Sequence, residues 1–181
     1  MIRVMGLDPG LGTFGLVVNE TDGETRRCLH ADVFTSEPLA RKLKVEVADD
    51  RVRRTQLLAR WLEGKLTRWA PHVVAAEAMS FPRNQIAVVC ICLAWGVIVD
   101  QVNLRGLALV TAMPRAWRQD LVPSGKESHS HAHAIRACPS FVLAAEGITA
   151  RDEVHARDAL GVAVWSERTN NVRAIMMARA A

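Results

Sequence analysis

The segment RVMGLDPG at residues 3–10, with the segment TFGLVV at residues 13–18 behind it, decides the fold. Residues 3–7 are an apolar run that predicts a strand, and the strand stops at Asp8-Pro9-Gly10, which is a strong turn signal. Residues 13–18 predict a second strand, so the pair forms a hairpin around a glycine-rich turn. A third strand is expected within residues 26–34. The first third of the chain therefore predicts an antiparallel meander.

The remainder of the chain predicts helices that alternate with short strands. After a loop over residues 36–50, a helix carries apolar residues at helical spacing and ends at Pro71. Residues 73–76 predict a buried strand that ends at Glu77. The further elements expected are a helix at 84–103, a strand at 107–111, and helices at 115–121, 126–137 and from near Thr149 to about 167, the last capped by Thr149 with Asp152 in the reciprocal position.

This order of elements predicts an α/β fold. It consists of a five-stranded mixed sheet, an antiparallel three-strand meander plus parallel strands, flanked by helices. The 181 residues suit one domain with a full core. We expect the domain at residues 1–168 and a C-terminal tail at 169–181, because Asn170-Asn171 breaks the helical pattern.

Composition limits the function classes. The chain has 23 basic and 19 acidic residues, a net charge of +4 that suits a polyanionic partner. The uncharged run at residues 86–99 is shorter than the ~20 residues needed to cross a bilayer, so it predicts a buried helix. The chain opens directly on a strand pattern, which predicts no signal peptide. Four cysteines in neither zinc nor redox spacing indicate a reduced cytoplasmic protein: Cys28, Cys90, Cys92 and Cys138.

Two carboxylates stand at the ends of predicted strands. Asp8 and Glu77 each close an otherwise apolar run. If the two strands are neighbours, the carboxylates meet at one edge of the sheet and repel unless a cation lies between them. Hard oxygen ligands suit Mg²⁺ or Mn²⁺. The alternative is structural: an ordinary turn at Asp8 and a solvated strand end at Glu77.

The last predicted helix adds a second polar pair. His155 and Asp158 are three residues apart, which places them on one helical face. Together they could ligate a divalent metal, or the imidazole could handle a proton. A solvated polar face is the alternative, and Asp152 and Glu153 are nearby acidic competitors. The histidines of the preceding helix (His129, His131, His133) offer no matching cysteine or acidic cluster, so the sequence does not favour a metal site there.

Three motifs in register resemble the RuvC-type Holliday junction resolvases of the RNase H-like superfamily. They are MGLDPG at residues 5–10, with Thr13 and Gly15 behind it, Glu77 after an apolar strand, and HARDAL at residues 155–160. The resemblance spans roughly residues 2–166. It implies a crossover junction endodeoxyribonuclease in which Asp8, Glu77, His155 and Asp158 hold two Mg²⁺ ions, with Mn²⁺ as a substitute. The nicks would carry 5′-phosphate and 3′-hydroxyl ends.

The resemblance also implies partners and contact residues. Lys126 and Arg118 resemble basic residues of the family that contact phosphate, and Arg115 and Arg83 are further candidates. Phe81 stands where the family often has an aromatic residue that opens the junction centre, in a context closer to resolvases of plant chloroplasts and phages. The expected partners are branched four-way junction DNA, a second copy of the chain in a homodimer through the long apolar helix, and a branch-migration motor. The expected location is the cytoplasm near the nucleoid, in a bacterial or phage setting.

Other functions remain open on the sequence. One is an RNase H-like nuclease on another nucleic acid, such as an RNA-DNA hybrid or a transposon end. A second is a catalytically silent junction-binding protein. An actin-like or sugar-kinase-like ATP-binding protein shares the Asp8-x-Gly10 opening, but such proteins usually need a second domain and 181 residues leave little room for it.

Overall fold

A five-stranded mixed sheet forms the centre of the protein. The computed structural model describes residues 1–39, 46–79 and 84–180. The strands are β1 (Ile2–Asp8), β2 (Thr13–Thr21), β3 (Arg26–Thr35), β4 (Val73–Glu77) and β5 (Ala108–Ala112), in the spatial order β3-β2-β1-β4-β5. The pairs β1/β2 and β2/β3 are antiparallel, and β1/β4 and β4/β5 are parallel. The predicted meander with added parallel strands is confirmed.

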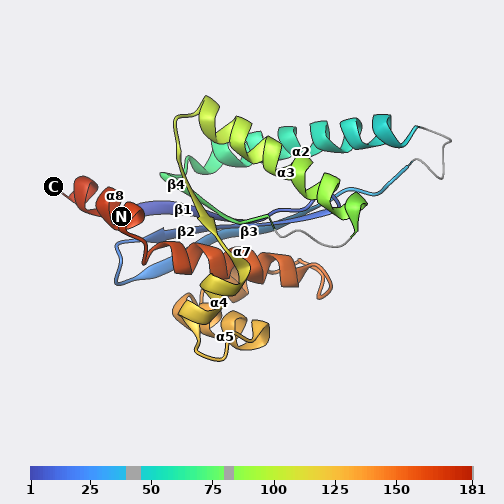
Figure 1. Ribbon diagram of the computed structural model, residues 1–181. Helices are drawn as coiled ribbons and strands as arrows, with labels where there is room; N and C mark the ends of the chain where they lie inside the picture. The colour runs from blue at the N-terminus through green and yellow to red at the C-terminus, as the bar shows by residue number, and fades with distance from the viewer. Residues whose placement is uncertain (40–45, 80–83, 181) are drawn as a thin grey trace.

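Helices cover both faces of this sheet (Figure 1). On one face lie α2 (Val47–Trp69) and α3 (Gln85–Leu104). The other face is covered by α7 (Glu153–Ser166), beside which lie α4 (Pro114–Leu121), α5 (Glu127–Ala137) and the short α6 (Phe141–Ala144). The last helix, α8 (Asn170–Ala180), lies at the end of the sheet where the chain also begins (Figure 1). At the opposite end of the sheet β1 and β4 finish at Asp8 and Glu77, the two carboxylates that the sequence analysis singled out.

Alternation along β1 explains the two cores. Met5 and Leu7 point toward α2 and α3, whereas Ile2 and Val4 pack with α7. Gly6 lies on the α7 side, where a Cβ atom would be 2.1 Å from the Ala159 carbonyl oxygen. The absence of a side chain at this position therefore lets α7 lie directly on β1, and this contact fixes the position of the helix that carries His155 and Asp158.

The long apolar helix α3 is buried on one side only. Ala94, Ile98 and Val102 pack into the core, whereas Ile86 is 62% exposed and Val89 is 40% exposed. By length and composition alone α3 could cross a membrane, but its inner side belongs to the hydrophobic core shared with α2 and the sheet. The prediction of a buried helix is thus correct for one face, and the other face is apolar and exposed in the single chain.

Some predicted boundaries are wrong. The helix α2 begins at Val47, inside the predicted loop at residues 36–50, and its first turn holds Asp49 and Asp50, which suit the positive end of the helix dipole. The helix α7 begins at Glu153 and not near Thr149. The Thr149 hydroxyl does donate to Asp152 Oδ2 (2.8 Å), but this bond closes a turn ahead of the helix.

Candidate active site

Asp8 and His155 form the first contact of the site. Asp8 is the last residue of β1 and His155 lies in the first turn of α7. Asp8 Oδ2 lies 2.6 Å from His155 Nδ1, and this hydrogen bond raises the pKa of His155. Gly15, paired with Asp8 across the β1/β2 ladder, permits the approach, because a Cβ atom there would be 2.1 Å from the His155 carbonyl oxygen. Two residues 147 positions apart are thus brought into direct contact.

Glu77 joins them from the neighbouring strand. Leu7 pairs with Ala76 in the parallel β1/β4 ladder, so Asp8 and Glu77 follow paired residues and reach the same sheet edge. Both line a small cavity of about 60 Å³ with Ile91 and Trp95 of α3. The sequence-based expectation that these strands are neighbours is therefore met.

The electrostatics of this edge indicate uncompensated negative charge. Burial, followed by the nearby charges of Asp8 and Asp158, raises the pKa of Glu77 to about 8. Burial likewise raises the pKa of Asp8, and Asp158 adds to the effect, although His155 opposes it. A cation bound between these carboxylates would lower their pKa values and offset the repulsion between their charges.

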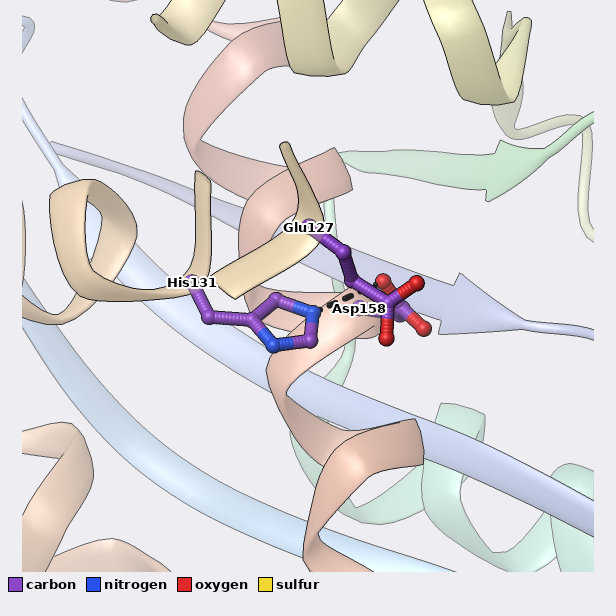
Figure 2. Close-up of side chains that lie close together, drawn as sticks. All are labelled: Glu127, His131 and Asp158. Atoms are coloured by element: carbon purple, nitrogen blue, oxygen red, sulfur yellow. Dashed lines mark hydrogen bonds and ion pairs between the residues drawn. The ribbon is translucent and has the colours of Figure 1, made fainter. Parts of the chain in front are cut away.

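Asp158 completes the set from α7 and is held by two basic side chains. Its Oδ1 lies 2.9 Å from His131 Nε2 and 3.1 Å from Arg118 Nη2. Arg118 also lies 3.6 Å from Glu127 Oε2. Figure 2 shows the Glu127 and His131 side chains of α5 converging on Asp158. The carboxylate is therefore fixed in orientation by groups on α4 and α5.

His131 is the site residue that the sequence reasoning missed. The sequence offers no cysteine or acidic cluster close to His129, His131 and His133, so it does not mark His131 as part of a site. In the structure His131 is buried together with Ser130 and Ala134 on the inner side of α5. The spacing of His131, Ala134 and Cys138, all buried, is a helical one and could have marked His131 as facing the core.

The donor set fits a divalent metal. Asp8, Glu77 and Asp158 supply carboxylate oxygens and His155 supplies an imidazole, the ligands used by Mg²⁺ and by Mn²⁺. Among the described residues, the grouping whose ligand atoms all lie within 4.8 Å of one another is Glu127, His131 and Asp158, and of the four predicted ligands it contains Asp158 alone. The raised pKa of Glu77 agrees with a site that lacks compensating positive charge.

The predicted DNA contacts are placed as follows. Arg115 and Lys126 are exposed, Arg115 in the first turn of α4 and Lys126 immediately before α5. Arg118 is less accessible, because it pairs with Asp158 and lies over the Trp117 ring. Phe81 and Arg83 lie outside the described residues.

This sheet order, with helices on both faces and carboxylates at the ends of β1 and β4 and on the helix that crosses β1, is that of the RNase H-like fold. The family model described as crossover junction endodeoxyribonuclease RuvC matches residues 4–166. The chain therefore belongs to the RuvC family. Membership implies dependence on a divalent metal and agrees with the donor set above.

Individual relatives support the assignment. The chain is 29% identical to the crossover junction endodeoxyribonuclease RuvC of Synechococcus sp. over 92% of this chain and 100% of that one. It is 26% identical to RuvC of Treponema pallidum over 89% of this chain and 75% of the relative. The structure of T. thermophilus RuvC in complex with a Holliday junction superposes with a TM-score of 0.72 over 98% of this chain and 96% of that one, at 19% identity. The yeast mitochondrial Holliday junction resolvase Ydc2 gives 0.62 at 13% identity, over 98% and 84%. At these identities the superpositions establish the fold.

Proposed function

We propose that the protein is a structure-selective endonuclease that resolves four-way DNA junctions by paired, symmetric phosphodiester hydrolysis. The observation that carries the proposal is the convergence of Asp8, Glu77, His155 and Asp158 at one end of the sheet. Membership of the RuvC family supports the substrate class, because the relatives are named for crossover junctions. The expected products carry 5′-phosphate and 3′-hydroxyl ends.

The cofactor we propose is Mg²⁺, two ions per site, held by Asp8, Glu77, His155 and Asp158, with Mn²⁺ as a substitute. When bound, such ions activate water and stabilise the leaving oxygen of a phosphodiester. The chain's own residues prepare the site. His155 holds a proton between its Nδ1 and Asp8 Oδ2, which orients the ring. His131 and Arg118 fix the Asp158 carboxylate, which favours a single ligand geometry.

Basic side chains around the site are proposed to contact the DNA backbone. Lys126 and Arg115 are exposed and suit phosphate contact, which adds salt-dependent affinity without sequence information. Arg118 forms an ion pair with Asp158 in the free protein, so a phosphate contact would be additional to that pairing. For Phe81 and Arg83 the proposal rests on the family resemblance alone.

We further propose a homodimer in which the exposed face of α3 meets its copy. The apolar outer face of α3 includes Ile86, Val89 and Val99, which a monomer leaves in water. Two active sites related by a two-fold axis also suit two symmetric cuts in a four-way junction. Sedimentation should show a species of twice 19.9 kDa, and Val89→Glu should shift it toward monomer. A monomer at micromolar concentration would contradict this arrangement.

The cellular setting follows from the substrate. We propose a cytoplasmic protein acting near the nucleoid, with a branch-migration motor as a partner. We retain the division into a nuclease domain at residues 1–168 and a tail at 169–181, although residues of α8 are helical and Val172 is buried against the main core.

The decisive experiment is cleavage of a labelled, immobile four-way junction in Mg²⁺, beside Asp8→Asn and a linear duplex of matching sequence. We expect paired symmetric nicks in the junction only, and Asp8→Asn should bind the junction without cutting it. Junction binding without cleavage by the wild-type protein in Mg²⁺ or Mn²⁺ would favour a silent binder. Cleavage of RNA-DNA hybrids in place of the junction would favour the other nuclease function.

A further inference from the structure

A cavity of about 610 Å³, lined largely by residues of polar type, lies beside the active site, and the proposed mechanism gives it no role. Three chain segments and one helix bring its lining together: the turn between β1 and β2, the end of β3 with the residues after it, the turn before α7, and α2. Its lining includes Gly12, Thr13, Thr35, Ser36, Arg54 and Arg151. We call this cavity the Arg54 pocket. Its volume is within the range of small-molecule sites in proteins.

The pocket is linked to the reacting residues on two sides. Gly12 lies in the turn that follows Asp8, Thr13 begins β2, and Asp152, which also lines the pocket, is three residues before His155. Both α2 and α7 begin at the end of the sheet where β1 finishes (Figure 1). A nucleic acid strand at the active site would therefore pass the mouth of the Arg54 pocket.

Arg54 gives the pocket its chemical character. It is only 7% exposed, and its Nε donates to Ser36 Oγ (2.9 Å), whose hydroxyl in turn donates to the Leu11 carbonyl oxygen (2.6 Å). These bonds hold the guanidinium against the turn after Asp8. A Cβ atom at Gly12 would lie 3.4 Å from Arg54 Nη2, so the absence of a side chain keeps that edge of the guanidinium accessible.

The charge of Arg54 has no ion-pair partner of its own among residues 1–39, 46–79 and 84–180. The hydrogen bonds from Arg53 to Asp50 Oδ1 are the main cause that lowers the pKa of Asp50, and the charge of Arg54 adds only a smaller contribution. Two carboxylates also line the pocket: Asp152 Oδ2 accepts a hydrogen bond from the Thr149 hydroxyl, and Glu37 has an interaction of its own. A buried guanidinium without a dedicated carboxylate is expensive, and an anion that enters the pocket would offset that expense.

We propose that the Arg54 pocket binds one backbone phosphate of the junction strand, adjacent to the phosphate that is cut. The planar guanidinium fork matches two phosphate oxygens, and the hydroxyls of Thr13 and Thr35 lie in the same pocket as further donors. This inference rests on the proposed function and adds a positioning contact to it: a strand anchored at the pocket is held in register with Asp8 and His155.

The test compares Arg54→Gln, which removes the charge, with Arg54→Lys, which keeps the charge and loses the fork. The matched control is Arg60→Gln, an exposed arginine on the same helix. Junction binding is measured across salt concentrations. Arg54→Gln should weaken binding about ten-fold and reduce the slope of log K against log salt by about one, the signature of one lost phosphate contact. Arg60→Gln should leave both unchanged.

Neutral phosphates locate the contact. Single methylphosphonate linkages are placed along the cut strand, and the wild-type protein should lose affinity at one position beside the scissile phosphate. In Arg54→Gln the same linkage should cause no further loss. Should Arg54→Gln fail to fold, as judged by its melting temperature, Arg54→Lys supplies the comparison, with a smaller loss at the same linkage. Equal affinity, salt slope and linkage profile in a folded Arg54 variant would overturn this site.

Two further outcomes separate the alternatives. Inorganic phosphate at constant ionic strength is expected to have little effect on melting. A phosphate-dependent rise that disappears in Arg54→Gln, with junction binding unchanged, would identify a free-anion pocket and overturn the strand contact. A wild-type protein that neither binds nor cuts the junction would overturn the proposed function together with this site. Failure confined to the Arg54 variants leaves the proposed function standing.

Discussion

Replacing Glu77 with glutamine should make the metal-free protein more stable while abolishing cleavage. Glu77 lies in the small cavity with Asp8, and burial together with the charges of Asp8 and Asp158 raises its pKa from the ordinary value of 4.5 to about 8. Glutamine has the same size and no ionisable proton. The substitution therefore removes the electrostatic penalty and also one oxygen ligand that the proposed mechanism needs.

The direction of the pH dependence follows from proton binding. In the unfolded chain Glu77 ionises near pH 4.5, whereas the folded protein keeps its proton up to about pH 8. The stability from this proton is complete below pH 4.5 and is lost as the pH rises through about 8. The full shift corresponds to about 5 kcal/mol at ~1.4 kcal/mol per pH unit. Because the cavity opens to solvent, we expect about half of this value.

The assay is thermal unfolding of wild type and Glu77→Gln in the presence of a chelator. Above pH 8 the variant should melt roughly 4–10 °C higher than the wild type, and near pH 4.5 the two should melt together. Glu63→Gln, an exposed position on α2, is the control and should follow the wild type. Adding Mn²⁺ at pH 8 should stabilise the wild type more than Glu77→Gln. Melting temperatures that differ by a constant amount at every pH would refute the reasoning.

Further predictions concern the support of the site and the core. His131→Ala should slow single-turnover junction cleavage about 10- to 100-fold and weaken Mn²⁺ binding measured by calorimetry, because Asp158 loses one of its two orienting partners. His131→Gln should recover part of the cleavage rate and part of the Mn²⁺ affinity. A His131→Ala protein that cuts at the wild-type rate would exclude this role. Gly6→Ala should prevent folding, as judged by circular dichroism, because its Cβ would meet the Ala159 carbonyl oxygen at 2.1 Å. Gly64→Ala, with no neighbour within 4 Å, should instead stabilise α2 by about 0.5–1 kcal/mol in urea unfolding.

The sheet was predictable because its strands carry strong local signals. The apolar runs of β1 and β4 end at a turn or a charged residue, and the structure places their ends at Asp8 and Glu77. The start of α2 was harder to predict, because Glu46, at the N-cap position, makes no side-chain cap bond. The short helix α6 was not predicted because four residues leave no measurable period.

The site was predictable only where the backbone alone fixes a side chain. Parallel pairing of β1 and β4 brings Asp8 and Glu77 to one edge, and helical spacing places His155 and Asp158 on one face. The partners of Asp158 depend instead on how α5 and α4 dock on α7. That docking depends on Gly161, where a Cβ atom would lie 2.5 Å from Trp117 Cζ3, so the buried Trp117 ring lies directly on α7.

Because of that docking, Asp158 is oriented by residues of two other helices, and no local sequence pattern predicts these contacts. Trp117 fixes α4 against α7, and the next residue, Arg118, is thereby delivered to Asp158, while His131 reaches the same oxygen from α5. A substitution at Trp117 should thus impair cleavage indirectly, because the position of Arg118, and with it the orientation of Asp158, depends on how the Trp117 ring packs on α7. In this protein the geometry of the active site therefore depends on the packing of a core tryptophan.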